Sequence, residues 1–227
     1  MTPGVARNGT CFIELTAGRR GLFIEIGQGF GLRCLHDGRR SVSLERDMID
    51  EHEPSRVLRY CPKCGAAALR PAGSKLWHCA SCGFELYLNV AAAVAALIAD
   101  EQGRLLIVVR GEEPRKGMWD LPGGFADPGE SAEAALRREV AEELGIEVTS
   151  MRFLCSYPNT YEYMGVHYAT MDLGFVCAVK DINAVQTSKS EVQELLFVRP
   201  QEIDTAQFAF VSVGKVVQRY RTEVVAR

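Results

Sequence analysis

Apolar residues in the second half of the chain follow two rhythms, each typical of a different element. Continuous apolar runs at 90–98 and 105–109, joined by a short polar turn, predict two buried strands. Within 131–144, apolar residues recur every fourth position and predict a helix, which Ser131 can cap and Gly145 ends. The remaining expected elements are a Gly- and Pro-containing loop at 119–124, strands at 147–155, 167–179 and 192–198, and a second helix at 210–224.

Residues 1–59 give a weaker pattern. Apolar runs at 12–15 and 22–26 predict two short strands, and Arg33 begins a third before a turn. The charged stretch 47–56 predicts a loop or linker. Because no catalytic combination of residues stands out here, we expect a small β-rich extension whose role the sequence leaves open.

Cysteines occur in two pairs within a module predicted at 60–88. Cys61 and Cys64 form the first pair and Cys79 and Cys82 the second, with fourteen residues between the pairs, close to the spacing of a four-cysteine zinc site. A glycine follows each pair and permits the positive φ of a tight turn. Four thiolates leave no open position for water, so the expected zinc is structural. The alternatives are four unrelated thiols or a redox pair.

Composition narrows the class of protein. Of the 227 residues, 47% are hydrophobic and 24% are charged, which is typical of a folded soluble chain and excludes extensive disorder. The net charge of −3 disfavours general nucleic-acid binding. The longest apolar run, 90–99, is much shorter than the ~20 residues that cross a bilayer, and 1–10 lacks the apolar core of a signal peptide. We therefore expect a cytoplasmic protein without membrane contact, in which the remaining cysteines are ordinary apolar residues: Cys11, Cys34, Cys155 and Cys177.

Three glutamates of the predicted helix point to a divalent metal. Glu139, Glu142 and Glu143 stand at i, i+3 and i+4 and so share one helical face. Carboxylates this close repel one another unless a cation lies between them, and Mg²⁺ and Mn²⁺ prefer such oxygen ligands. Arg138 is placed to orient the group and partly neutralise it. The alternative is an acidic helix face exposed to solvent.

The stretch resembles the Nudix box, a signature that here spans 23 residues. All nine fixed positions are filled, by Gly124, Glu130, Arg138, Glu139, Val140, Glu142, Glu143, Gly145 and Ile146. The resemblance covers about 90–227, and the preceding zinc ribbon makes the chain similar to the NADH pyrophosphatase branch of Nudix hydrolases and its bacterial relatives. It implies an α/β (α+β) fold, a Nudix α/β/α sandwich with a mixed sheet. The regions expected from it are a β-rich extension at 1–59, a zinc ribbon at 60–88 and a Nudix domain at 89–227.

The resemblance also implies roles in metal-dependent hydrolysis of a pyrophosphate bond. Glu139 and Glu143 correspond to ligands of Mg²⁺ or Mn²⁺, and Glu142 to a further ligand or to the base that takes the water proton. Arg138 corresponds to a residue that orients the glutamates, and Glu130 to one that braces the loop.

Two more positions follow from relatives. Many of them add a main-chain metal ligand where Gly123 stands, and some place the general base outside the box. Glu191 or Glu194 could take that role here, and Glu191 is the choice because relatives carry an acid there. The alternative is an ordinary surface charge at the start of a strand.

The expected substrate contacts lie on both sides of the box. NADH-cleaving relatives carry a loop with Trp and Phe downstream; Ser156 and Pro158 match that loop, but its Trp and Phe have no counterpart. We therefore expect NADH not to be the preferred substrate. Aromatic and amide side chains could stack on a base or bond a ribose, or could be strand and core residues: Tyr157, Asn159, Tyr161 and Tyr163. Three basic residues could meet phosphate oxygens, or could be ordinary solvated charges: Arg110, Arg115 and Lys116.

Together these features predict an enzyme that cleaves a pyrophosphate bond in a nucleoside-diphosphate-linked compound such as ADP-ribose, a sugar nucleotide or a dinucleotide. The alternatives are an NADH or NAD pyrophosphatase and a non-catalytic nucleotide-sensing protein. Removal of nucleotide caps from RNA is a weaker possibility because the sequence contains no basic track. The expected partners are a small nucleotide derivative and a second copy of the chain, since family members are often dimers.

Overall fold

The computed structural model describes residues 54–187 and 191–225, and of residues 1–53 only the backbone of five short strands. The chain divides into two compact units, Met1–Glu51 and His52–Arg227. No helix in the described part of the chain has the length and apolar character needed to cross a lipid bilayer.

The first unit contains one antiparallel sheet in sequential strand order. The three strands predicted in this region are all present, within β2, β3 and β4. Most of the expected 47–56 linker lies outside the described residues, but its last part begins a short helix, α1 (Pro54–Val57). The strands are β1 (Gly4–Val5), β2 (Cys11–Thr16), β3 (Gly21–Ile26), β4 (Leu32–Leu35) and β5 (Val42–Ser43).

The cysteine module forms a small three-stranded antiparallel sheet. Its strands are β6 (Leu69–Pro71), β7 (Leu76–Cys79) and β8 (Glu85–Tyr87). A buried cluster contains only two large side chains besides two of the cysteines, namely Leu69 and Trp77. A core this small provides little hydrophobic stabilisation, so a module of this kind depends on a metal cross-link.

The remainder of the chain forms two sheets. The larger has the order β12-β9-β14-β13; β14 runs parallel to β9 and the other pairings are antiparallel, which makes the predicted mixed sheet. The smaller is antiparallel, in the order β11-β10-β15. Their strands are β9 (Ala91–Ile98), β10 (Leu105–Arg110), β11 (Trp119–Asp120), β12 (Gly123–Phe125), β13 (Val148–Tyr163), β14 (Val166–Val179) and β15 (Val192–Val198).

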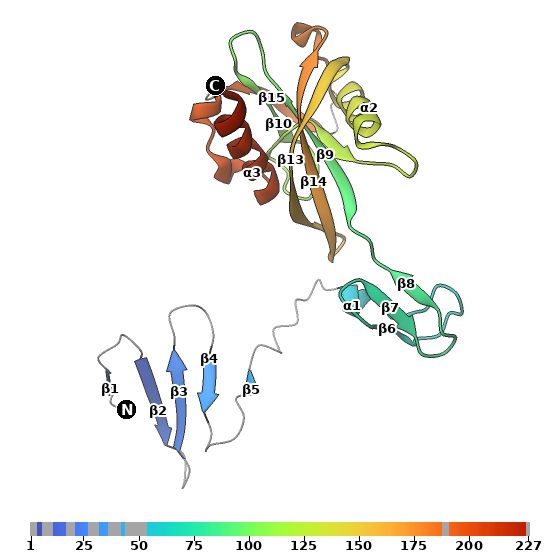
Figure 1. Cartoon of the computed structure of the whole chain (residues 1–227), viewed down its shortest axis with the longest axis vertical. Coiled ribbons are helices and arrows are strands. Elements are labelled where there is room, and N and C mark those ends of the chain that lie inside the picture. The colour runs from blue at the N-terminus through green and yellow to red at the C-terminus, as the bar shows by residue number, and fades with distance from the viewer. Residues whose placement is uncertain are drawn as a thin grey trace. The chain divides into compact units, whose positions relative to one another are not determined.

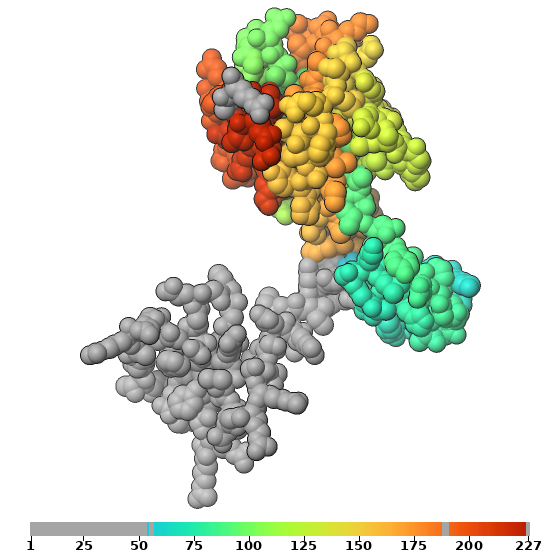
Figure 2. All heavy atoms as spheres, viewed as in Figure 1, coloured from blue at the N-terminus to red at the C-terminus, as the bar shows by residue number. Residues whose placement is uncertain are grey.

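Helices α2 (Ala132–Leu144) and α3 (Val211–Tyr220) lie on opposite sides of the larger sheet (Figure 1). Alternate residues of β9 explain this arrangement. Val94, Ala96 and Ile98 pack with α2. Ala95 and Leu97, which point to the other face of the strand, pack with α3. Figure 2 shows the α3 segment packed directly against the β13 segment. The layers are those of the expected α/β/α sandwich.

Helix α2, which contains the three clustered glutamates, begins and ends as predicted. The Ser131 hydroxyl accepts a hydrogen bond from the Ala134 N–H, and Gly145 adopts a left-handed conformation with φ of 65°. The second predicted helix is shorter than expected, because α3 ends at Tyr220 and a π-helical turn continues over Arg221–Val225. Three single-turn 3-10 helices complete the elements, at Ile182–Ala184, Pro200–Glu202 and Thr205–Gln207.

Two local expectations require correction. The segment at 119–124, expected to be a loop, contributes the short strands β11 and β12 to the edges of the two sheets. The segment from Ser156 to Tyr163, expected to be a loop after the box, is the second half of β13 and pairs with β14 along its whole length. Pairing with a neighbouring strand outweighs the local turn signals in both places.

Candidate active site

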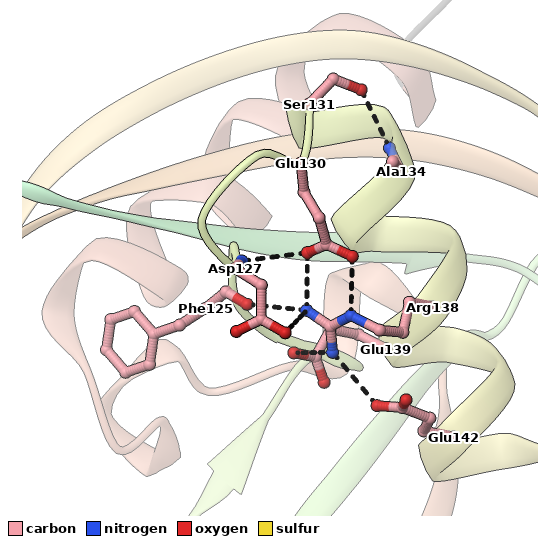
Figure 3. Close-up of polar contacts among 8 residues, drawn as sticks. All are labelled: Phe125, Asp127, Glu130, Ser131, Ala134, Arg138, Glu139 and Glu142. Carbon is pink, nitrogen blue, oxygen red and sulfur yellow. Dashed lines mark hydrogen bonds and ion pairs between the residues drawn. The ribbon is translucent and has the colours of Figure 1, made fainter.

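Arg138 is the centre of a network of carboxylates on the outer side of α2 (Figure 3). Its Nε and one terminal nitrogen donate to the two carboxylate oxygens of Glu130, both at 2.9 Å. The other terminal nitrogen donates to Glu139 at 2.9 Å and to Glu142 at 3.1 Å. The guanidinium also donates to the Phe125 carbonyl oxygen at 3.0 Å. One side chain therefore connects Glu130 and Phe125 of the loop before the helix to Glu139 and Glu142 of the helix.

Glu130 makes contacts that fit the bracing role expected of it. Besides the bidentate pair with Arg138, its carboxylate accepts a hydrogen bond from the Asp127 N–H at 2.9 Å. The hydrogen bonds from the Arg138 guanidinium and the Asp127 amide lower the pKa of Glu130 to about 2. Glu142 lies further out, with 59% of its side chain exposed. It contacts Arg138 and is not part of the cavity described below.

Glu143 lies in a very different environment on the inner side of α2. One oxygen accepts a hydrogen bond from the Gly123 N–H at 3.0 Å. Burial raises the pKa of Glu143 to about 8; the Gly123 hydrogen bond opposes this, and the negative charges of Asp120, Glu139 and Glu191 add to it. The pKa of Glu139 is also raised, chiefly by burial and against the effect of Arg138. Carboxylates that are expensive to ionise in this way are stabilised by a divalent cation, whose charge favours the deprotonated form.

Two glycines, Gly123 just before the box and Gly124 at its first position, permit this close approach of loop, sheet and helix. A Cβ atom at Gly123, whose φ is 147°, would lie 2.0 Å from the Val94 carbonyl oxygen. A Cβ atom at Gly124 would lie 2.6 Å from a carboxylate oxygen of Glu139. Any side chain at Gly124 would therefore displace the Glu139 carboxylate from the end of β12.

A cavity of about 330 Å³ opens beside Glu139 and Glu143, within the size range of small-molecule sites. Both sheets and both long helices contribute to it. The lining side chains that carry chemistry are Arg110, Glu112, Glu113, Asp120, Glu139, Glu143, Asn159, Thr170, Asp172 and Glu191, and those that form an aromatic wall are Phe125, Tyr161 and Phe210.

The cavity separates the predicted substrate contacts into two groups. Asn159 and Tyr161 line it, whereas Tyr157 does not and instead packs against the core beneath α3, with the Lys215 ammonium 5.8 Å from its ring centroid. Tyr163 stacks on Tyr161 at a centroid distance of 6.4 Å and is half exposed. Adjacent strand residues point to opposite faces, so residues two apart in β13 share a face, and position along the strand decides which of them reach the cavity.

The basic residues divide in the same way. Arg110 lines the cavity, but its guanidinium is paired with Asp120 at 2.8 Å and donates to the Pro114 carbonyl oxygen at 2.9 Å. Arg115 and Lys116 are outside the lining. Of the two candidates for the base, Glu191 lines the cavity and Glu194 does not.

Two aspartates of the cavity, Asp120, which is partly buried, and Asp172, which is buried, were not identified from the sequence. Asp120 lies between Arg110 and the box glutamates, and burial raises its pKa against the effect of Arg110. Asp172 lies on β14 and is 5% exposed. Neither belongs to a motif or a metal-binding spacing. The sequence signal for each is a lone acidic residue inside or beside an apolar stretch, which is uncommon because a buried charge is costly.

The four cysteines of the ribbon meet as predicted. Their sulfur atoms lie within 4.8 Å of one another. The Sγ atoms of Cys61 and Cys82 are 3.7 Å apart and those of Cys64 and Cys79 are 3.8 Å apart. A tetrahedron with metal–sulfur bonds of about 2.3 Å has edges of about 3.8 Å, so the donor set and its spacing fit a zinc ribbon.

Both knuckles have the same backbone geometry. The Gly65 N–H donates to the Cys61 carbonyl oxygen at 2.8 Å, and the Gly83 N–H donates to the Cys79 carbonyl oxygen at 2.9 Å. The two glycines have φ of 73° and 71°. This is the positive φ that the sequence interpretation required of them.

Comparison with known proteins agrees with this site. The model of the NUDIX domain family matches residues 89–219. "NAD-capped RNA hydrolase NudC" of Deinococcus radiodurans is 32% identical over 105 residues, which are 45% of this chain and 38% of that protein. "NAD-capped RNA hydrolase ndx-9" of Caenorhabditis elegans is 31% identical over 153 residues, which are 67% of this chain and 37% of that protein. The chain thus spans less than half the length of these curated relatives.

A solved NUDIX hydrolase from Nitrosomonas europaea shows the same fold. It aligns with 74% of this chain and 93% of its own, at a TM-score of 0.55 and 23% identity. A MutT NUDIX hydrolase from Burkholderia pseudomallei aligns with 58% and 98%, at a TM-score of 0.50 and 22% identity. The family model covers more than half of the chain and contains the glutamate helix and the cavity. The chain therefore belongs to the NUDIX domain family.

Proposed function

We propose that this protein is a Nudix pyrophosphohydrolase that uses Mg²⁺ or Mn²⁺ to cleave a pyrophosphate bond in a nucleoside-diphosphate-linked compound. The observation that carries the proposal is the position of Glu143, partly buried at the cavity wall beside Glu139 and bonded to the Gly123 N–H. A diphosphate is dense in negative charge and can enter an acidic cavity only together with cations. The same cavity offers an aromatic wall that suits a nucleoside.

Glu139 and Glu143 are the proposed side-chain ligands, with the Gly123 carbonyl oxygen as a main-chain ligand. When bound, the divalent cation supplies charge stabilisation of the phosphate oxygens and favours ionisation of the attacking water. Arg138 holds Glu139 in place through its hydrogen bond and takes no part in proton transfer. Glu142, exposed and bonded to Arg138, fits a second ligand or a proton acceptor only after its side chain turns inward.

Glu191 is the proposed general base. It lines the cavity just before β15, and its negative charge contributes to the raised pKa values of Glu139 and Glu143, which supports a position close to the proposed metal ligands. Glu194 has no such position. Mutation of the base to Gln should lower kcat by about 10²–10⁴-fold while leaving KM nearly unchanged.

The substrate we favour is ADP-ribose, a sugar nucleotide or another adenosine-linked diphosphate. NADH or NAD is the second candidate, and it is favoured by the relatives, which are named as NAD-capped RNA hydrolases. The segment in which NADH-cleaving relatives carry Trp and Phe argues against NADH as the preferred substrate. Here it is a strand that presents Asn159 and Tyr161 to the cavity. The polar groups of a binding site determine its discrimination between substrates more than its apolar contact area does.

A substrate panel tests the function. NADH, NAD, ADP-ribose, sugar nucleotides, nucleoside triphosphates and NAD-capped RNA would be compared side by side with Mg²⁺ or Mn²⁺, by phosphate assay and product mass. We expect cleavage of the pyrophosphate bond, with a substrate other than NADH showing the highest kcat/KM. A rate for NADH about tenfold above every other compound, which is ~1.4 kcal/mol of transition-state preference, would return the protein to the NADH pyrophosphatases. Binding without turnover of any compound would instead indicate a nucleotide sensor.

The rest of the chain has a supporting role in this proposal. We propose a β-rich extension at 1–59, a ribbon at 60–88 that binds structural zinc through its four cysteines, and a catalytic domain at 89–227. A homodimer in the cytoplasm is the proposed state, since paired cysteines bind zinc in a reducing compartment and related enzymes are often dimers. Light scattering coupled to gel filtration measures the oligomeric state directly.

A further inference from the structure

Asp172 is a carboxylate in the cavity wall that the proposed chemistry does not use. It lies on β14, is 5% exposed and lines the cavity together with Thr170. One oxygen accepts a hydrogen bond from the Thr170 hydroxyl at 3.3 Å, and the other accepts one from the Ser212 hydroxyl. Burial raises the pKa of Asp172, and the hydrogen bonds from Ser212, Thr170 and Asn159 oppose that rise. A carboxylate has four acceptor positions, so acceptor capacity remains on the side that faces the cavity.

The strand register places Asp172 away from the metal-binding end. Phe125 of β12 is opposite Ala93 of β9, and Ala93 is opposite Asp172 of β14. Neighbouring strands are about 4.8 Å apart, so β12, which carries Gly123 and Gly124, and β14 are separated by roughly 10 Å. That span, two strands across the sheet, is on the scale of a nucleoside. Asp172 therefore belongs to a second part of the cavity.

An aromatic wall accompanies this second part. Tyr161 contacts Phe125 edge to face at a centroid distance of 5.1 Å and contacts Phe210 at 5.6 Å. The Arg110 guanidinium lies 5.3 Å from the Phe210 ring centroid, and its charge is committed to Asp120. A flat apolar ring system can pack on this wall, while the nearby carboxylate remains free to accept a hydrogen bond.

We propose that Asp172 reads the nucleobase of the substrate, by accepting a hydrogen bond from an exocyclic amino group of a base packed against Tyr161, Phe125 and Phe210. This inference rests on the proposed function, which orients the substrate with its pyrophosphate at Glu139 and Glu143. A carboxylate is only an acceptor, so it pairs with an amino group and repels a carbonyl oxygen at the same position. Bases with an amino group, such as adenine, are selected over hypoxanthine, which carries a carbonyl oxygen there.

The experiment compares AMP with IMP and with purine riboside 5′-monophosphate, which contain no pyrophosphate bond. IMP replaces the 6-amino group by a carbonyl oxygen and turns N1 into an N–H donor, whereas purine riboside monophosphate only lacks the amino group. Isothermal titration calorimetry with the full chain and Mg²⁺ measures these affinities, with 2′-deoxy-AMP as a further ligand. We expect wild-type protein to bind AMP about tenfold to a hundredfold more tightly than IMP. This arm needs no variant, so it remains informative if substitutions at Asp172 impair folding. Equal affinity for AMP and IMP would overturn the proposal, and a loss confined to 2′-deoxy-AMP would show that the cavity recognises the ribose and not the base.

The Asp172→Asn variant tests the residue itself. Its amide can donate to the carbonyl oxygen of hypoxanthine and can still accept from Ser212, so the preference for AMP should fall to about threefold or less. Asp181→Asn is the matched control. It makes the same change of charge outside this cavity, at the cap of the 3-10 helix Ile182–Ala184, where Asn caps as well as Asp. An unchanged AMP preference in Asp172→Asn would overturn the assignment.

Hydrolysis assays separate this inference from the proposed function. If ADP-ribose is cleaved, the ratio of its kcat/KM to that of its hypoxanthine analogue should decrease in Asp172→Asn by the factor seen in binding. If no pyrophosphate compound is cleaved while AMP still binds in preference to IMP, the proposed function is wrong and the base-reading site stands. If cleavage occurs without discrimination between the two bases, the function stands and the inference fails.

Discussion

The two metal-binding regions proposed for this protein are built in opposite ways. In the ribbon, four sulfur atoms lie within 4.8 Å of one another and two tight turns fix them. At the glutamate helix, the carboxylates are held apart, because Glu142 is bonded to Arg138 outside the cavity and Glu143 to the Gly123 N–H at its wall. A closed set of four ligands suits a structural ion, whereas an open set leaves positions for water and substrate. The comparison indicates that loss of metal unfolds one region and only inactivates the other.

The largest expected effect is on the open site. Glu143→Gln keeps the size of the side chain and removes its charge, so activity on the true substrate should fall by about 10²–10⁴-fold while the melting temperature changes little. Steady-state kinetics and thermal unfolding measure the two effects. Glu133→Gln is the matched control, because Glu133 is exposed in the first turn of the same helix and outside the cavity. If Glu139→Gln and Glu143→Gln both keep wild-type rates, the metal assignment is wrong.

Loss of metal from the four-cysteine site should affect folding of the ribbon. Purified protein is expected to carry about one zinc per chain, and Cys79→Ser should lose that zinc and unfold the ribbon, since binding and folding are coupled in such modules. Elemental analysis and protease sensitivity at 60–88 measure this. Cys155→Ser, a change at a cysteine outside the cluster, is the control. Absence of zinc from protein purified without chelators would contradict the prediction.

Arg138 allows a smaller test of the open site. Arg138→Lys keeps a positive charge and loses the bidentate contact with Glu130 and the simultaneous contacts with Glu139 and Glu142. We expect kcat/KM to fall about tenfold to a hundredfold, with a higher Mg²⁺ concentration needed for half-maximal rate. A variant with reduced rate but unchanged Mg²⁺ dependence would argue against a positioning role through Glu139.

The smallest expected effect is a pH dependence of stability that has opposite directions for Glu143 and Glu130. The folded-state pKa of Glu143 is raised to about 8, so the folded protein without added Mg²⁺ or Mn²⁺ binds an extra proton above the usual pKa of a glutamate. Its contribution to stability is therefore lost as pH rises from about 5 to 8, with a slope of at most ~1.4 kcal/mol per pH unit. The pKa of Glu130 is lowered to about 2, and its contribution is lost in the opposite direction, as pH falls below the usual range.

Thermal unfolding from pH 5.5 to 8.5, without chelator so that zinc is retained, measures this slope. Mg²⁺ should flatten it, because a cation favours the ionised carboxylate. The Glu143→Gln variant should lack the slope, and the Glu133→Gln control should keep it. A slope unchanged in Glu143→Gln would assign the proton to another group of the cavity, such as Asp120.

Local signals in the sequence determined a large part of this protein. The capping serine, the apolar repeat and the final glycine of α2 depend on neighbours within a few residues, and the structure reproduces them. The cysteine knuckles are equally local, since each is a single turn closed by a glycine with positive φ. The box glutamates could be assigned to one helix for the same reason, and relatives supplied their expected roles.

Tertiary structure alone decided which side chains share the cavity. Asp172 and Ser212 are 40 residues apart and meet because α3 packs against β14. Arg110 of β10 pairs with Asp120 of the neighbouring strand β11. Position along β13 brings Tyr161 to the cavity and leaves Tyr157 against the core. The partly buried state of Glu143 likewise comes from β12, which lies across the helix at Gly123. A sequence pattern reports the period of an element but not the neighbour it packs against, and the charge state of a carboxylate is set by that neighbour.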